Sequence, residues 1–270
     1  MSSNENADKA KPKIFFTQIG REESIVRALP VITGYPILDT LLCGGLPQKF
    51  AVVITSPPCD EKDLLIKRFL ETGVENDEPT FYVTIEPSLA ESLAQHEPSN
   101  FYMFLCNPQG EAIIKKTSNI SILKGVENLT DLSVALTSAI RKLDPSHKGP
   151  RRMCLNVISD VLLLHGSVQT RRWLTELLTQ LKSVGFTTIA IIDPQIHPPE
   201  QLHAILGLFE GEVNIREAET DGGLGRFLKI KRMSNQKYLK DEAYLTEDEQ
   251  QNQRISGLED SKSRGFIRLS

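Results

Sequence analysis

Residues 50–73, FAVVITSPPCDEKDLLIKRFLETG, decide the fold of this chain. The stretch starts with a largely apolar run, two prolines then interrupt it, and the remainder repeats apolar residues at helical spacing. A short apolar run that ends at a turn is typical of a strand buried on both faces of a parallel sheet. The stretch therefore predicts a strand, a tight loop and a helix, which together form the repeating unit of α/β folds.

The same alternation continues through most of the chain. Further strands are predicted from the apolar runs TFYVTIE (residues 80–86), FYMFLCN (101–107), MCLNVIS (153–159) and TTIAIID (187–193). Helical patterns lie between several of them, the longest being VQTRRWLTELLTQLKSVG at residues 168–185. Residues 211–234 contain two strand-like runs joined by the turn sequence DGG, which predicts an antiparallel hairpin. We expect an α/β fold with a mainly parallel sheet, helices on both faces and a C-terminal antiparallel hairpin.

Composition sets the boundaries of this domain. Residues 1–13 are polar and are expected to form a disordered arm, whereas residues 14–240 supply the apolar positions of a single domain. Within that domain, REESIVRAL at residues 21–29 predicts a short helix. From residue 241 onward the chain is acidic and rich in glutamine, so residues 241–270 are expected to form a mostly disordered tail.

Charge, cysteine spacing and hydropathy argue against several classes of protein. A net charge of -4 and an isoelectric point near 5.8 do not favour a dedicated nucleic-acid binder, although this average would hide a local basic patch. The cysteines form no C-x-x-C pair and the histidines no H-E-x-x-H motif, so no metal site is expected. No apolar stretch approaches the roughly 20 residues of a membrane span, and the polar N-terminus does not resemble a signal peptide. We expect a cytoplasmic protein without a membrane partner.

Four segments, in order, resemble the RecA-like KaiC family of ATPases. The first, GYPILDTLLCGGLPQKFAVVITSPP at residues 34–58, is similar to the segment that leads into the family's phosphate-binding loop. The others are TFYVTIEPS (80–88), similar to the strand that presents catalytic glutamates, CLNVISDVLLL (154–164), similar to the Walker B strand, and GRFLKIKRMS (225–234), similar to the C-terminal strand. The resemblance covers residues 33–234. It implies a RecA-like three-layer fold, ATP with magnesium as the ligand of active members, and an archaeal source.

The loop itself departs from the family's pattern G-x-x-x-x-G-K-[ST], in which glycines let backbone N–H groups wrap the phosphates. Ser56, Cys59 and Glu61 stand at the family's glycine positions, and Asp63 stands where a hydroxyl holds magnesium. The added side chains crowd positions that need positive φ or close backbone approach, and the two carboxylates repel phosphate. Lys62 is retained. We interpret the loop as a degenerate nucleotide site and expect no cofactor.

The same residues suggest how an empty loop is stabilised. A helix N-terminus carries unpaired N–H groups and a partial positive charge, which a bound phosphate normally satisfies. Here Asp60, Glu61 and Asp63 would supply carboxylates from the chain itself, with Asp60 as the N-cap. Lys62 is then a structural cation paired with these acids, the alternative being a residual phosphate ligand.

Two further positions of the family's catalytic site are altered. Matching the Walker B motif places Asn156, which carries no charge, at the aspartate that acts on magnesium. Asp160 matches a later aspartate of the motif, and it either takes a shifted Walker B role or caps and pairs at the sheet edge. Glu86 matches the first of two catalytic acids, whereas Pro87 replaces the second. Without placed metal and phosphate, Glu86 is expected to be a relic of a general base, and no catalytic residue is expected.

Basic residues on the last predicted strand are the remaining candidates. Arg232 and Ser234 match the lysine and arginine with which family members contact a neighbouring subunit's nucleotide. Arg232, with Lys229 and Lys231, is therefore a candidate contact across subunits, the alternative being a solvated strand face. A basic patch for nucleic acid would need these residues and Lys237 to combine with Arg151, Arg152, Arg171 and Arg172, the alternative being a solvated face.

Three hypotheses of function follow. The first is a non-catalytic RecA/KaiC-like protein, a pseudo-ATPase that regulates or scaffolds a protein partner such as an active paralogue. The second is a divergent ATPase or nucleotide sensor that uses Lys62, Glu86 and Asp160 with ATP and magnesium. The third is a single-strand DNA-binding protein similar to recombinase paralogues. The combined loss of the phosphate, metal and subunit-crossing positions favours the first hypothesis, without ATP hydrolysis.

Overall fold

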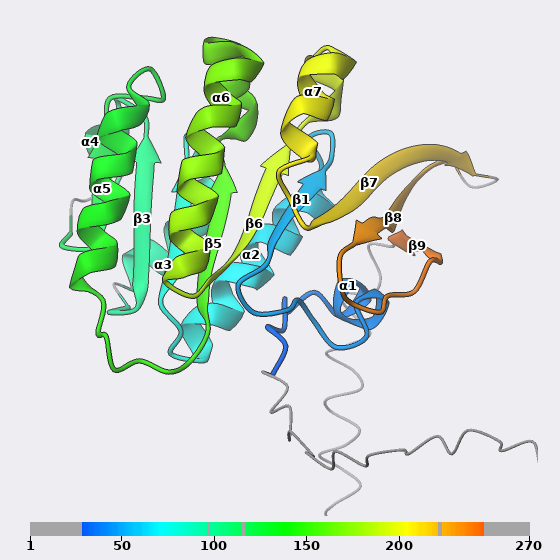
Figure 1. The fold of residues 1–270 in the computed structure, drawn as a ribbon, viewed down its shortest axis with the longest axis horizontal. Coiled ribbons are helices and arrows are strands. Elements are labelled where there is room, and N and C mark those ends of the chain that lie inside the picture. Colours follow the sequence, from blue (N-terminus) through cyan, green and yellow to red (C-terminus); the bar gives the residue numbers. More distant parts are fainter. Residues whose placement is uncertain (1–28, 97, 115–116, 221–222, 246–270) are drawn as a thin grey trace, which may run out of the picture.

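The computed structural model describes residues 29–96, 98–114, 117–220 and 223–245, and within these ranges the chain forms one nine-stranded sheet covered by helices (Figure 1). The strand order is β4-β3-β2-β5-β6-β1-β7-β8-β9. Neighbouring strands from β4 to β7 are parallel, and β8 and β9 are antiparallel additions at one edge. The predicted α/β fold with a mainly parallel sheet and a C-terminal hairpin is confirmed.

The five strands predicted from apolar runs are all present, together with both strands of the hairpin. Their bounds are β1 (Ala51–Thr55), β2 (Thr80–Thr84), β3 (Phe101–Cys106), β5 (Arg151–Asn156), β6 (Phe186–Ile192), β7 (Gly211–Thr220) and β8 (Gly223–Met233). The sequence does not predict β4 (Ile120–Leu123) or β9 (Glu242–Leu245). These two strands have four residues each and form the two edges of the sheet.

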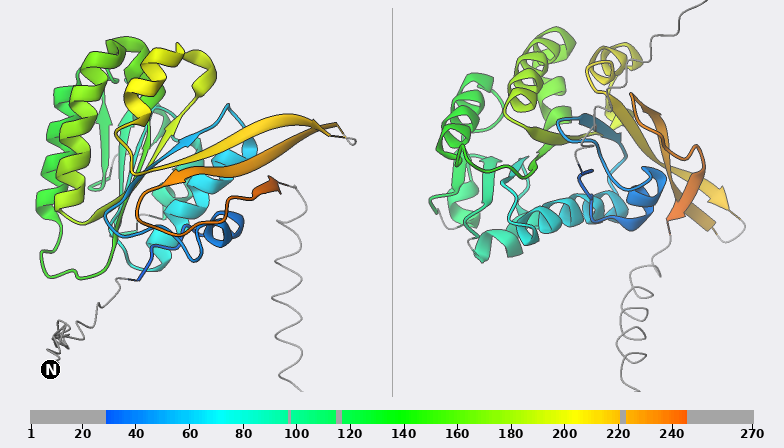
Figure 2. Two further views of the ribbon diagram at one scale, coloured as in Figure 1. Left: turned by 45° about the vertical axis from the view of Figure 1, so that its right-hand side comes forward. Right: turned by 60° about the horizontal axis from the view of Figure 1, so that its bottom comes forward.

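Helices cover both faces of the sheet (Figure 2). One face carries α2 (Asp60–Glu75) and α3 (Glu91–Gln95), and the other carries α5 (Leu129–Lys142), α6 (Ile158–Ser183) and α7 (Pro199–Leu206). The shorter elements are α1 (Pro36–Leu41), η1 (Ser88–Ala90), α4 (Gly110–Ile113) and η2 (Pro194–Ile196). The arrangement is the expected stack of three layers.

Strand side chains alternate between two apolar cores. In β1, Val52 and Ile54 belong to the core that includes α2, whereas Ala51 and Val53 belong to the core that includes α5 and α6. All five residues of β1 are buried. A parallel strand covered on both faces has no solvent side, which is why these strands appear in the sequence as continuous apolar runs.

The longest helix, α6, contains a break at Gly166. This glycine has a φ of 68° and a ψ of 174°, so residues 158–165 and 167–183 are two helical segments joined there. The sequence predicts only the second segment, whose buried side chains include Trp173. This segment ends just before Gly185, which has a φ of 91° and terminates the helix as predicted.

The structure corrects one predicted boundary. β9 lies inside the predicted tail, because the strand pairs with β8 while Leu245 is buried in the core on the α2 face. The folded domain therefore extends at least to Leu245 rather than ending at residue 240. The predicted arm at residues 1–13, most of the predicted helix at 21–29 and the tail beyond 245 lie outside the described residues. Among the helices that are described, none is long and apolar enough to cross a membrane.

Candidate functional site

The loop between β1 and α2 is held to its neighbours by hydrogen bonds. The Ser56 N–H donates to the Ile192 carbonyl at 3.0 Å, which ties the loop to β6. The Ser56 hydroxyl donates to the Pro57 carbonyl at 2.7 Å and lies 3.4 Å from the Cys59 sulfur. All residues from 56 to 63 are described, and none of them has a positive φ. The backbone therefore accommodates side chains at the three positions where the family pattern has glycine.

The acidic residues of the loop lie in the first turn of α2. Cys59 is the N-cap, with an extended backbone at φ −165°, and its carbonyl accepts from the Asp63 N–H at 3.2 Å. The prediction that Asp60 is the N-cap is wrong, because this extended turn at Cys59 makes Asp60 the first helical residue. Asp60, Glu61 and Asp63 nevertheless place three carboxylates where the helix dipole favours negative charge.

An ion-pair network joins Glu61 to the C-terminal hairpin. One Arg226 nitrogen lies 3.1 and 3.4 Å from the two Glu61 carboxylate oxygens, and another donates to Glu217 at 2.6 Å. Glu217 lies on β7 directly opposite Arg226 on β8. The side chains of Glu61 and Arg226 are only 16% and 30% exposed. A single guanidinium therefore bridges a loop carboxylate and a hairpin carboxylate, partly withdrawn from water.

Lys62 has a partner within its own turn. Its ammonium lies 2.9 Å from the Asp63 carboxylate, and its side chain is only 16% exposed. Lys62 therefore pairs with an acid of its own turn, and its role as a structural cation stays a prediction. Because Asp63 already neutralises part of this charge, Lys62 attracts phosphate less strongly than an unpaired lysine would.

The hydroxyl of Tyr82 forms a hydrogen bond with the side chain of Asn156. Tyr82 is fully buried on β2, and its oxygen accepts from the Asn156 side-chain amide at 3.3 Å. Burial raises the pKa of the Tyr82 hydroxyl, and the Cys154 thiol and the Asp63 carboxylate act in the same direction. Asn156 ends β5, at the place expected from the Walker B match, and its amide binds a neighbouring side chain.

Asp160 lies beyond the end of β5, in the first turn of α6, as expected. Val157 is the N-cap of this helix, so Asp160 does not cap it. Burial raises the pKa of the Asp160 carboxyl, and its own backbone N–H and the charge of His197 oppose this shift. Burial, with Asp160 nearby, also raises the pKa of the Cys106 thiol to about 12. The charge of Asp160 thus acts on two buried side chains, His197 and Cys106. No group of His, Cys, Asp and Glu in the described ranges could hold a metal ion.

Glu86 is exposed on the turn that follows β2. The Thr84 hydroxyl accepts from the Glu86 N–H at 3.0 Å and donates to the Glu86 carbonyl at 2.8 Å, which fixes the backbone of the turn. Its carboxylate forms no ion pair with the described part of the chain. After this turn a short helical segment begins at Ser88, as η1 followed by α3.

Arg232 is engaged inside the chain. Its terminal nitrogens donate to the carbonyls of Phe209 at 2.8 Å and Leu206 at 2.6 Å. Leu206 is the last residue of α7, and its carbonyl also accepts from the Phe209 N–H at 3.3 Å, so Arg232 adds a second donor at the end of this helix. Lys229 and Lys231 are exposed on β8. The contact across subunits stays a prediction, and the two lysines are more accessible for it than Arg232.

The four arginines considered for a basic patch do not form one surface. Arg152 is fully buried, where it pairs with Glu78 and donates to two backbone carbonyls. Arg151 and Arg171 each donate to a backbone carbonyl of another element. Because one member is in the core and two are tied down, the patch that nucleic-acid binding would need is weakened.

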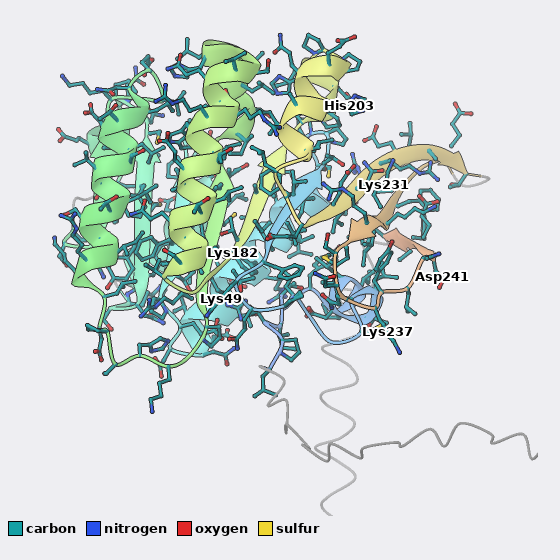
Figure 3. All side chains as sticks on the ribbon, viewed as in Figure 1. Lys49, Lys182, His203, Lys231, Lys237 and Asp241 are labelled. Atoms are coloured by element: carbon teal, nitrogen blue, oxygen red, sulfur yellow. The ribbon has the colours of Figure 1, made fainter. Side chains whose placement is uncertain are left out.

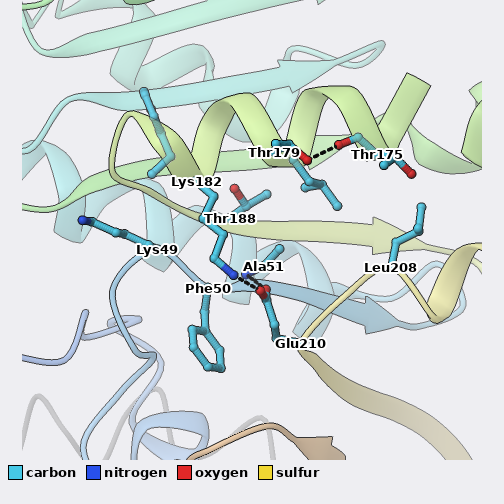
Figure 4. Close-up of a pocket in the computed structure, with 11 residues that line it drawn as sticks. Lys49, Phe50, Ala51, Thr175, Thr179, Lys182, Thr188, Leu208 and Glu210 are labelled. Carbon is cyan, nitrogen blue, oxygen red and sulfur yellow. Dashed lines mark hydrogen bonds and ion pairs between the residues drawn. The ribbon is translucent and has the colours of Figure 1, made fainter. Parts of the chain in front are cut away.

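A small cavity lies at the amino end of β1, away from the loop. Its volume is about 180 Å³, and it is bounded by α6, β1 and the residues before β7 (Figure 4). Lys182 pairs there with Glu210, whose carboxylate also accepts from the Ala51 N–H at 2.8 Å. Lys49 and Lys182 lie on this side of the molecule, whereas Lys231 lies on the antiparallel edge (Figure 3). These labelled lysines therefore do not gather around the loop.

Sequence reasoning missed two residues of the site, Tyr82 and Arg226. Tyr82 lies within an apolar run in which an aromatic ring reads as core, and its hydroxyl becomes informative only once β2 is paired with β5. Arg226 lies in the C-terminal segment GRFLKIKRMS, and the resemblance implies no role for this position. The surplus of acid in the loop was the available signal, because partly buried carboxylates need a cation.

The strand order, the loop between β1 and α2 and the antiparallel edge define a RecA-like fold of the P-loop superfamily. A family model described as "ATPase: KaiC" matches residues 31–246, and the chain therefore belongs to the KaiC family.

Relatives of known sequence are similar to the chain at low identity. A UPF0273 protein of Pyrobaculum aerophilum is 24% identical over 226 residues, 78% of this chain and 77% of the relative. A UPF0273 protein of Sulfurisphaera tokodaii is 27% identical over 177 residues, 62% of this chain and 60% of the relative's length. The crystal structure of a KaiC-like protein from the archaeon Pyrococcus horikoshii matches 80% of this chain and 94% of its own, with a TM-score of 0.58 and 20% identity. That likeness shows the fold alone, and the archaeal homologues agree with the archaeal character of the resemblance.

Proposed function

We propose that this chain is a non-catalytic member of the KaiC family, a pseudo-ATPase that acts as a regulatory or scaffolding partner of an active relative or another protein. The observation that carries the proposal is the ion pair between Glu61 and Arg226 at the start of α2. In this pair the Glu61 carboxylate, rather than a bound phosphate, neutralises the Arg226 guanidinium beside the loop. Glu61 thereby has a cationic partner without a ligand.

The residues of the loop do not fit a triphosphate with magnesium. Asp60, Glu61 and Asp63 all lie in the first turn of α2, where phosphates would have to approach the helix N-terminus. Two like charges about 4 Å apart repel by about 1 kcal/mol in water and about 4 kcal/mol near a protein surface. Since about 1.4 kcal/mol is tenfold in affinity, one such carboxylate weakens nucleotide binding roughly fivefold to several hundredfold.

The other altered positions support the same proposal. Asn156 carries no charge with which to hold magnesium, and its amide binds Tyr82. Glu86 is an exposed carboxylate. A general base contributes to catalysis only when it lies within hydrogen-bond reach of a positioned nucleophile. Arg232 is occupied by carbonyls of its own chain. Binding, metal and charge-stabilising positions thus all depart from what hydrolysis requires.

Calorimetric titration with MgATP and MgADP tests the proposal. We expect no saturable heat up to about 1 mM nucleotide from the folded, nucleotide-free protein. The matched variant combines Ser56→Gly, Cys59→Gly, Glu61→Gly and Asp63→Thr, and we expect it to gain saturable binding. Adding Lys62→Ala to that variant should remove the gained binding, because the lysine supplies the charge for the phosphates.

Nucleotide binding by the unaltered chain is the outcome that would contradict the proposal. Micromolar binding of MgATP by the unaltered chain, abolished by Lys62→Ala, would overturn the proposal and favour the nucleotide sensor. A phosphate-release assay on the same samples then separates a sensor from a divergent ATPase.

A further inference from the structure

The cavity at the amino end of β1 combines buried apolar walls with a charged mouth (Figure 4). Leu178 and Phe186 are buried, whereas the side chains of Lys182 and Glu210 are 54% and 26% exposed. The volume of about 180 Å³ exceeds the roughly 150 Å³ of an engineered apolar cavity that binds benzene. The cavity can therefore hold the apolar part of a small organic molecule while the polar end of that molecule stays at the mouth.

The mouth presents a positive and a negative group side by side. The Lys182 ammonium pairs with one oxygen of the Glu210 carboxylate, and the other oxygen accepts from the Ala51 N–H at 2.8 Å. The Glu210 N–H donates to the Ala51 carbonyl at 2.9 Å, which also fixes the backbone at this position. An ammonium has three donors and a carboxylate about four acceptor positions, so both groups retain capacity for further hydrogen bonds.

The pair leaves the mouth without a large net charge. Lys49 is the other charged residue that lines the cavity, and its ammonium points away from Lys182 and Glu210 (Figure 4). A ligand that carried only one charge would be attracted by one member of the pair and repelled by the other. A ligand that carries both charges on neighbouring atoms avoids this repulsion, because each of its charges can face the opposite member of the pair.

A buried hydroxyl also faces the cavity. Thr188 lies on β6, opposite Ala51 of β1, and is only 2% exposed. Its side chain forms no hydrogen bond with the described residues, whereas the hydroxyl of the adjacent Thr187 accepts from the Lys49 N–H at 3.0 Å. Buried polar side chains normally have a partner. The Thr188 hydroxyl is therefore a hydrogen-bonding group beside the ion pair that the described chain does not use.

We propose that this cavity binds a small α-amino acid with an apolar side chain, such as leucine. Lys182 and Thr188 donate to the carboxylate of the ligand, and Glu210 accepts from its ammonium group. The side chain of the ligand packs against Leu178 and Phe186. Ligand sites commonly combine such an apolar lining with a few convergent polar groups that fix orientation.

The site is independent of the loop between β1 and α2. The cavity lies at the amino end of β1, whereas the loop follows its carboxyl end. A ligand in the cavity would contact the second segment of α6, the starts of β1 and β6, and the residues before β7. Binding of the amino acid is therefore expected whether or not the loop binds nucleotide.

Titration of the full chain with L-leucine, followed by the methyl NMR signals of Leu178 and Leu208, tests the proposal. We expect saturable shifts with a dissociation constant of about 1 mM, an ordinary affinity for so small a ligand. Methyl signals of Leu65 and Leu70, which lie on α2 in the other core, should not move. Leucinamide lacks the carboxylate and N-acetyl-leucine lacks the ammonium group, so each should bind at least about tenfold more weakly.

Three variants separate a ligand site from a structural role. Glu210→Gln keeps an oxygen for the Ala51 N–H but removes the negative charge, and it should weaken leucine binding at least about tenfold. Thr188→Val keeps the shape of the side chain and should weaken binding about fivefold without lowering the melting temperature, because the hydroxyl has no partner among the described residues. Lys67→Met is the control, since it removes a lysine from an ion pair on α2 and should leave binding unchanged.

Three outcomes would overturn the proposal. They are no saturable shift up to about 20 mM L-leucine, equal affinity for leucine and its two analogues, and unchanged affinity in the folded Glu210→Gln chain. A lower melting temperature for Thr188→Val would also count against it, because the hydroxyl would then serve the fold rather than a ligand.

Discussion

We expect Arg152→Ala to lower the free energy of unfolding by about 4 kcal/mol. The side chain is fully buried on β5, where it pairs with Glu78 and its guanidinium carbon lies 5.0 Å from the centre of the Phe69 ring. Removing one partner of a buried ion pair costs about 3–5 kcal/mol, because the remaining charge is left without compensation. The carbonyls of Ile32 and Phe69 also lose a donor. Each buried carbonyl that loses its donor costs about 1–3 kcal/mol by itself. These costs are not additive with that of the broken ion pair, so we take the middle of the range of about 3–5 kcal/mol.

Urea unfolding followed by circular dichroism measures this loss. With a slope of about 2 kcal/mol per molar urea, a loss of 4 kcal/mol lowers the midpoint by about 2 M. The control, Arg172→Ala, removes one partner of an ion pair whose side chains are both exposed, and it should cost less than about 0.5 kcal/mol. If Arg152→Ala costs less than about 1 kcal/mol, the reasoning is refuted, because Glu78 must then be hydrated or paired anew.

Gly34→Ala should destabilise the fold by about 2 kcal/mol, because Gly34 has a φ of 76° and an added Cβ would lie 2.0 Å from the Thr72 hydroxyl. Equal melting temperatures for the two proteins would contradict this. The raised pKa of Tyr82 means that the folded state holds the phenolic proton more tightly than the unfolded state. Its contribution to stability is therefore complete below about pH 10 and is lost as the pH rises further. Tyr82→Phe should cost about 1 kcal/mol at neutral pH and flatten this alkaline decline, so parallel stability curves from about pH 8 to about pH 11 would count against it.

The central strands could be predicted because a strand buried on both faces consists almost entirely of apolar residues, which form a recognisable run in the sequence. β1 and β2 are buried at every position. The edge strands lack this pattern. In β9, Glu242 and Tyr244 are not buried and only Leu245 is, so four residues carry too little periodicity to distinguish a strand from a tail. β9 is a strand because it pairs with β8, and the four residues of β9 do not by themselves indicate that pairing.

Some features of the site could likewise be predicted from local sequence, whereas others depend on how distant segments pack. The substituted positions of the loop follow from motif spacing, whereas the Glu61–Arg226 pair joins residues 165 apart and depends on the order β1-β7-β8. The predicted N-cap failed because capping depends on the backbone angles of Cys59, which residue types do not determine. Tyr82 and Asn156 meet because of the register between β2 and β5.

During synthesis, the loop after β1 is made long before the partner of Glu61 exists. Arg226 is added 165 residues later, which at about 5–20 residues per second corresponds to roughly 8–30 s. Throughout that interval three carboxylates share the start of α2 with Lys62 as their neighbouring cation. The loop reaches its final charge balance only when the C-terminal hairpin joins the sheet. A chain that ends before β8 therefore lacks part of its N-terminal loop chemistry as well as its last strands.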